Sequence, residues 1–122
     1  MEKFPVITVC SSMKFKKHFQ VAYEMLILNG YIVIPLDVYS DDSTKPSREV
    51  LAAKHRQKID MSDAIFVLNE DGYIGESTKD EIAYAIENGK DVKFLEPLSG
   101  HPFIMQMLDE EIFKYLNLRG NI

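Results

Sequence analysis

An apolar run at residues 64–68 opens onto a polar loop and then a helical segment, and the loop and helix read Asn69-Glu70-Asp71-Gly72-Tyr73-Ile74-Gly75-Glu76-Ser77-Thr78-Lys79-Asp80-Glu81-Ile82-Ala83-Tyr84-Ala85. A strand that passes through such a loop into a helix start is where open α/β sheets hold their ligands. The helix start also offers free backbone N–H groups that suit anions. This stretch therefore predicts both a parallel sheet and the place of its site.

Apolar and helical segments alternate along the rest of the chain. Continuous apolar runs predict strands at 5–10, 31–36, 64–68 and 92–95, each covered on both faces. Helical periodicity predicts helices at 14–29, from Ser47 to about residue 61, from Ser77 or Thr78 to Gly89, and from 103 to about 116. This order predicts a flavodoxin-like or Rossmann-like three-layer α/β/α fold, with a parallel sheet of four or five strands in a single domain, residues 1–122.

Composition limits the classes of partner. The 122 residues are 46% hydrophobic and 27% charged, as in soluble globular domains. No apolar run approaches the roughly 20 residues that span a bilayer, and the start lacks a signal-peptide cleavage site, so we expect a cytoplasmic protein without a membrane partner. A single cysteine excludes an internal disulfide. The net charge of -5 argues against binding a nucleic acid polymer, whereas a single nucleotide needs only local donors.

The segment after the first strand, Cys10-Ser11-Ser12, contains neither a Gly-x-Gly-x-x-Gly nor a phosphate-loop motif. Ser11 and Ser12 could hold a ribose or a phosphate, and Ser12 could equally cap the following helix. We expect Cys10 to be a small buried residue rather than a nucleophile. We expect His55 to lie at the surface rather than act as a base. Without a second His or Cys at ligand spacing, no metal and no cofactor is predicted.

Two carboxylates, Glu81 and Asp71, are candidate catalytic groups. With Ser77 as N-cap, Glu81 would be the fourth helical residue, where the helix dipole favours its ionised form. A fixed carboxylate facing a sugar can attack the anomeric carbon, as in retaining glycosidases. The alternative is a capping box in which Glu81 only reaches back to Thr78. Asp71 could protonate the leaving base, or it could simply be a turn residue beside Gly72.

Four consecutive segments resemble the nucleoside 2-deoxyribosyltransferase-like superfamily. They are the run at 62–69, the glycine-rich loop, the helix 77–85 ending Glu81-Ile82-Ala83-Tyr84-Ala85, and Gly89-Lys90-Asp91-Val92. The likeness is strongest from about residue 60 to 95. The resemblance implies cleavage of the N-glycosidic bond of a (deoxy)nucleoside or its 5′-monophosphate, with transfer of the deoxyribosyl group to another base or to water. It also implies a homodimer, or a larger homo-oligomer, whose sites lie at the interface.

The resemblance also implies residue roles. Glu81 matches the family nucleophile, Asp71 the loop acid and Ser77 the hydroxyl that touches a 5′-phosphate. Tyr73 or Phe15 would supply the aromatic ring found past the first strand. Candidate substrate-binding residues are Ser11, Ser12, Gly72, Tyr73, Gly75 and Ser77.

Three functional classes remain open from the sequence. The first is a deoxyribosyltransferase or nucleotide N-glycosidase. The second is a non-catalytic module that binds a nucleotide or an ADP-ribose-like signal on the same fold, because fold alone does not decide function. The third is a small scaffold that acts through protein contacts.

Overall fold

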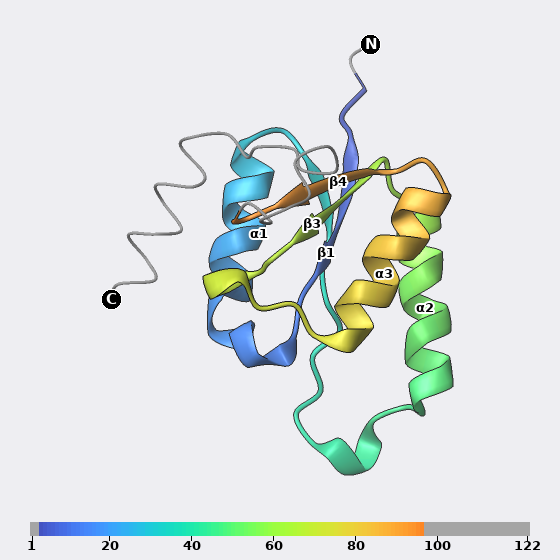
Figure 1. Cartoon of the computed structure of the whole chain (residues 1–122). Helices are drawn as coiled ribbons and strands as arrows, with labels where there is room; N and C mark the ends of the chain where they lie inside the picture. Colours follow the sequence, from blue (N-terminus) through green and yellow to red (C-terminus); the bar gives the residue numbers. More distant parts are fainter. Residues whose placement is uncertain (1–2, 97–122) are drawn as a thin grey trace.

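A computed structural model describes residues 3–96, and Figure 1 shows their arrangement. The strands are β1 (Val6–Cys10), β2 (Ile32–Ile34), β3 (Ala64–Val67) and β4 (Asp91–Phe94). They form a parallel sheet in the order β2-β1-β3-β4, with Cys10 beside Val67 and Ala64 beside Asp91. The predicted parallel sheet is confirmed, and within residues 3–96 it has four strands rather than five.

Helices cover both faces of the sheet and make three layers (Figure 1). On one face lies α1 (Phe19–Leu28), which packs on alternate strand residues such as Ile7 and Val9. On the other face lie α2 (Arg48–Asp60) and α3 (Glu76–Glu87), which pack on the residues in between, such as Cys10 and Val67. The central strands β1 and β3 are buried on both faces and are apolar except for Thr8, whereas the edge strand β4 alternates polar and apolar residues.

The strand order creates a switch point between β1 and β3. The chain leaves β1 through the 3₁₀ turn η1 (Met13–His18) and α1 toward one face. It leaves β3 through η3 (Glu70–Gly72) and α3 toward the opposite face. A connection of this kind opens a crevice at the carboxyl ends of the two strands. The loops after Cys10 and after Leu68 are therefore the ones that frame a site.

Several predicted helix ends are confirmed. Ser47 is the N-cap of α2, and its hydroxyl accepts a hydrogen bond from Val50 N at 3.3 Å. Gly30, just past α1, has a φ of 90°, which a residue with a side chain rarely adopts. The short turn η2 (Asp42–Thr44) lies in the predicted polar loop before α2. No helix within residues 3–96 is both long enough and apolar enough to cross a membrane.

The first helix begins later than predicted. Residues 13–18 form the 3₁₀ turn η1, and α1 starts only at Phe19. The reason lies at Phe15, whose backbone is non-helical (φ -100°, ψ 17°) and whose ring is buried in the core. Burial of this ring thus interrupts what looked like one continuous amphipathic helix.

The third helix begins earlier than predicted. Its N-cap is Gly75, and Ser77 and Thr78 lie inside the first turn, with Thr78 buried. Glu81 therefore lies five residues past Glu76, in the second turn, where the helix dipole acts more weakly than expected. Ile82 and Ala85 of α3 are buried against the sheet, whereas Ile86 is 46% exposed. The predicted helix at 103–116 lies outside the described residues.

Candidate active site

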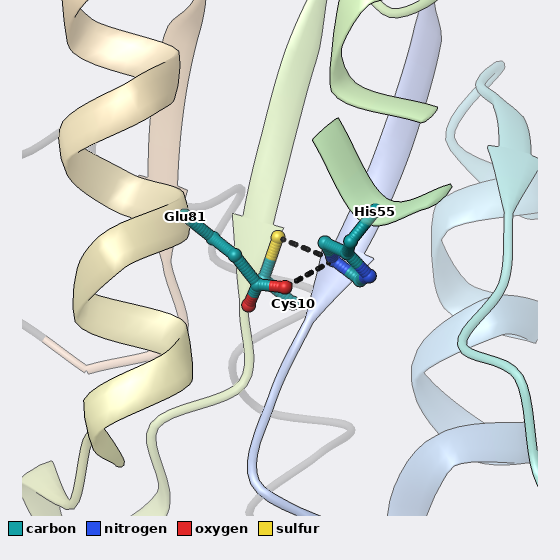
Figure 2. Close-up of side chains that lie close together, drawn as sticks. All are labelled: Cys10, His55 and Glu81. Carbon is teal, nitrogen blue, oxygen red and sulfur yellow. Dashed lines mark hydrogen bonds and ion pairs between the residues drawn. The ribbon is translucent and has the colours of Figure 1, made fainter. Parts of the chain in front are cut away.

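Three side chains from three different elements meet at the carboxyl end of β1 (Figure 2). Cys10 is the last residue of β1, His55 lies on α2 and Glu81 lies on α3. His55 Nε2 is 2.8 Å from Glu81 Oε2 and 3.5 Å from Cys10 Sγ. The three donor atoms all lie within 4.8 Å of one another, so the cluster could also surround a cation.

The cluster is largely shielded from water. Cys10 is fully buried, and the side chains of His55 and Glu81 are 12% and 16% exposed. Burial raises the pKa of the Cys10 thiol well above its ordinary value, and the nearby Glu81 charge raises it further. Cys10 is therefore a neutral thiol at pH 7. The distance between His55 and Glu81 is that of an Nε2–H donating a charge-assisted hydrogen bond to a carboxylate.

The cluster differs from a cysteine–histidine–acid catalytic triad. In a triad the acid orients the imidazole through one ring nitrogen while the other nitrogen faces the nucleophile. Here His55 Nε2 faces both Cys10 and Glu81. The cluster therefore lacks the arrangement of such a triad. The prediction that Cys10 is a small buried residue is confirmed.

The capping-box alternative for Glu81 is wrong. Thr78 is inside α3 rather than at its start, and the Glu81 carboxylate reaches across to His55. Within residues 3–96, His55 is the ion-pair partner of Glu81, and no lysine or arginine holds this carboxylate. The carboxylate is thus fixed by a hydrogen-bond donor and not tied to a permanent cation.

Sequence reasoning missed the position of His55. It was expected to be solvated or hydrogen-bonded at the surface, as an isolated histidine on a helix more often is. The spacing of Leu51, His55 and Ile59 could have indicated that His55 faces inward. These residues lie four apart, on the stripe of α2 that is not fully exposed. Ile59 is completely buried, and it anchors this stripe against the sheet.

The loops after β1 and β3 contact each other in front of the sheet. Ser12 Oγ accepts a hydrogen bond from Lys14 N at 3.1 Å, so Ser12 is a cap, as one alternative predicted. A Cβ atom on Gly75 would lie 3.9 Å from both Ser12 Cβ and the Tyr73 hydroxyl. Lys14 Nζ lies 4.3 Å from the centre of the Tyr73 ring, and Phe15 meets that ring edge to face. The loops thus bring together Ser12, Tyr73 and Gly75, three of the predicted substrate-binding residues.

The other predicted residues are more dispersed. Ser11 Oγ bridges the two loops, 3.0 Å from Ser12 O and 3.2 Å from Leu68 O. Ser77 is exposed in the first turn of α3. Asp71 and Gly72 are exposed in η3, with positive φ values of 56° and 75°. The Asp71 backbone N–H donates a hydrogen bond to the Glu96 carboxylate, which holds the turn in place. The roles of Asp71 and Gly72 toward a substrate stay predictions.

Comparison with known proteins finds likenesses among solved structures. No protein-family model matches the chain, and no curated protein matches it. A solved structure of the CMP N-glycosidase BcmB from Clostridium botulinum resembles the chain with a TM-score of 0.59 and 15% identity. The match covers 96% of this chain and 99% of that one. At this identity the likeness establishes that the two chains share a fold.

Proposed function

We propose that this protein cleaves the N-glycosidic bond of a (deoxy)nucleoside or its 5′-monophosphate, with Glu81 as the nucleophile. The observation that carries the proposal is the Glu81 carboxylate itself, held by His55 at the switch point of the sheet and tied to no lysine or arginine within residues 3–96. Ligands of open α/β sheets bind at such points. Two further observations support the proposal: the neighbour's name is that of a nucleotide N-glycosidase, and the motif around Glu81 resembles that of the deoxyribosyltransferase-like superfamily.

The proposed reaction has two steps. A Glu81 oxygen attacks C1′ of the sugar while the C1′–N bond breaks, and the base leaves with the bonding electron pair and takes up a proton. Water, or the nitrogen of a second base, then attacks C1′ of the glycosyl ester and releases the Glu81 carboxylate. His55 donates its hydrogen bond to Oε2, which leaves Oε1 for the attack. His55 is thus a positioning residue that sets the direction of the nucleophile.

The loops would hold the remainder of the substrate. Ser11 and Ser12 are proposed to contact the sugar or its phosphate, and Ser77 together with the free N–H groups at the start of α3 suits a 5′-phosphate. Asp71 is proposed as the acid that protonates the leaving base. The half-exposed Tyr73 is proposed to place its aromatic ring beside a base or a sugar. A second copy of the chain is proposed to complete each site.

The test is the release of free base by wild type and by Glu81→Gln, followed by chromatography. Purified full-length protein is incubated with deoxynucleosides and with nucleoside 5′-monophosphates, CMP included, with and without a second base. The substitution is isosteric and still accepts a hydrogen bond from His55, so the fold is retained. We expect base release to fall by about a thousandfold or more. The second base separates transfer from hydrolysis, because only transfer produces a new nucleoside.

A matched control lies on the same helix. Glu87 is exposed at the opposite end of α3 from the proposed phosphate site, so Glu87→Gln should leave turnover unchanged. Wild-type turnover in Glu81→Gln would remove Glu81 from the mechanism. If wild type binds a nucleotide or ADP-ribose without releasing base, and Glu81→Gln binds equally well, the non-catalytic module is the correct function instead.

A further inference from the structure

One ring nitrogen in the cluster faces two partners at once. His55 Nε2 lies 2.8 Å from a Glu81 oxygen and 3.5 Å from the Cys10 sulfur. A neutral imidazole nitrogen carries either one proton or one lone pair, and a single proton can serve only one of these partners well. The sulfur, the imidazole nitrogen and the carboxylate oxygen thus lie within 4.8 Å of one another, with the nitrogen facing both of the other atoms (Figure 2).

We propose that Cys10, His55 and Glu81 form a binding site for a thiophilic divalent cation of the Zn²⁺ class. Such a cation accepts one lone pair from each atom, so it satisfies all three donors at the same time. Sulfur, imidazole nitrogen and carboxylate oxygen are the three ligand types of zinc in proteins, and three protein ligands leave a fourth position for water. The soft sulfur ligand disfavours Mg²⁺ and Ca²⁺.

One donor–donor separation has the value expected of a zinc site, a second must widen, and the third, between the Cys10 sulfur and a Glu81 oxygen, is at most 4.8 Å. Zinc–ligand distances of about 2.0–2.3 Å place neighbouring ligands about 3.3–3.6 Å apart in a tetrahedron. The separation between the Cys10 sulfur and the His55 nitrogen, 3.5 Å, already has this value. The separation between the nitrogen and the Glu81 oxygen, 2.8 Å, must widen by about half an ångström, which rotation of the glutamate side chain allows.

Charge and rigidity also favour a cation. Metal binding releases the protons of the Cys10 thiol and of His55 Nε2 to solvent, and the divalent cation then neutralises the thiolate and the carboxylate in a site shielded from water. Cys10 belongs to the sheet, and His55 and Glu81 lie on the two helices that cover one face of it. Tyr84 of α3 donates a 2.6 Å hydrogen bond to Asp60 of α2, which holds these two helices together. Lys58, the nearby cation that acts on Cys10, is turned away to Pro35 O at 2.8 Å and to Asp37 at 3.1 Å.

Bound metal would have a consequence that rests on the proposed function. A cation bound to Oε2 draws electron density from the Glu81 carboxylate, which makes Oε1 a weaker nucleophile toward C1′. Zn²⁺ should therefore inhibit base release at the concentrations at which it occupies the site, and a chelator should restore activity. The metal site itself does not depend on the enzyme hypothesis.

The direct test is cobalt spectroscopy on the full-length chain after treatment with a chelator. Co²⁺ bound by a thiolate gives a sulfur-to-cobalt charge-transfer band, and Cys10 is the only cysteine in the sequence, so the band reports this site alone. Zn²⁺ should displace Co²⁺ and abolish the visible bands. The affinity for Zn²⁺ is then measured by competition with a chromophoric chelator.

Variants locate the ligands. Cys10→Ser should abolish the charge-transfer band, and His55→Ala and Glu81→Gln should each weaken Zn²⁺ binding by at least about tenfold. His18→Ala is the matched control, because it removes the other histidine–carboxylate pair, His18–Glu70, which includes no cysteine, and it should leave the affinity unchanged. Cys10→Ala accompanies Cys10→Ser in case a buried hydroxyl prevents folding, and circular dichroism checks each variant.

The outcomes separate the two proposals. Absence of the charge-transfer band in wild type, or an unchanged Zn²⁺ affinity in the folded cysteine variant, overturns the metal site, and base release would then be insensitive to Zn²⁺. A band that depends on all three ligands supports the site, even in a protein that releases no base from any nucleotide. In that case only the proposed enzymatic function fails.

Discussion

The contact between His55 and Glu81 makes a quantitative prediction about stability. Both side chains are less than a fifth exposed, and their atoms are 2.8 Å apart. A hydrogen bond to a charged group in such a setting contributes about 1.5–3 kcal/mol. We therefore expect a double-mutant cycle of His55→Ala, Glu81→Ala and the double variant to give a coupling energy of this size in the free energy of unfolding.

The same helix supplies a control pair. Lys79 and Glu76 are 3.2 Å apart, but their side chains are 59% and 88% exposed. Water and mobile ions screen such a pair, so its coupling energy should be about 0.5 kcal/mol or less. The two cycles thus compare two ion pairs that share an element and differ in burial.

The assay is urea unfolding at pH 7, with a chelator present so that bound metal adds nothing to the measured stability. The urea slope of a protein of this size is about 2 kcal/mol/M, so the expected coupling corresponds to about 1 M in unfolding midpoint. A coupling energy for His55 and Glu81 no larger than that of the exposed pair would refute the reasoning. It would mean that the carboxylate is not fixed by the imidazole in solution.

Three further predictions address the site and its support. Asp71→Asn should lower base release about a hundredfold for poor leaving bases and much less for good ones, because good leaving bases need little protonation. The measurement is kcat/KM for a series of bases, and equal losses across the series would count against an acid role. Lys54 holds the pKa of Asp37 below its ordinary 3.8, chiefly through its hydrogen bond to the carboxylate. Lys54→Ala should therefore lower the free energy of unfolding above pH 3.8, and its difference from wild type should vanish as the pH falls through the lowered pKa. Urea unfolding at several pH values measures this difference, and a difference that persists in acid would contradict the prediction. Ile59→Ala should destabilise the fold by about 2–5 kcal/mol, because the side chain is fully buried, whereas Val50→Ala, on an exposed part of the same helix, should change stability by at most about 0.5 kcal/mol in the same assay.

The site could be predicted only in part from the sequence. Glu81 stood out because it begins a recognisable helical motif after a strand and a glycine-bearing loop, and the structure places it at the switch point of the sheet. The start of its helix was harder to predict, because Ser77 and Thr78 are both good N-cap residues and Gly75 takes the cap position instead. Gly75 lies close to Ser12 and Tyr73 in the neighbouring loops. A capping rule that considers only nearby residues in the sequence does not include such contacts.

The amino-acid sequence by itself determined the alternation of strands and helices and caps such as Ser47, since these depend on neighbours within a few residues. The alternation in turn indicated a parallel sheet. Only the tertiary structure brought Cys10, His55 and Glu81 together. They are far apart in the chain, and their meeting depends on the sheet order, on the register of β1 beside β3 and on the rotation of α2 about its axis. No local pattern encodes these three quantities, because each is fixed by how whole elements pack in the core.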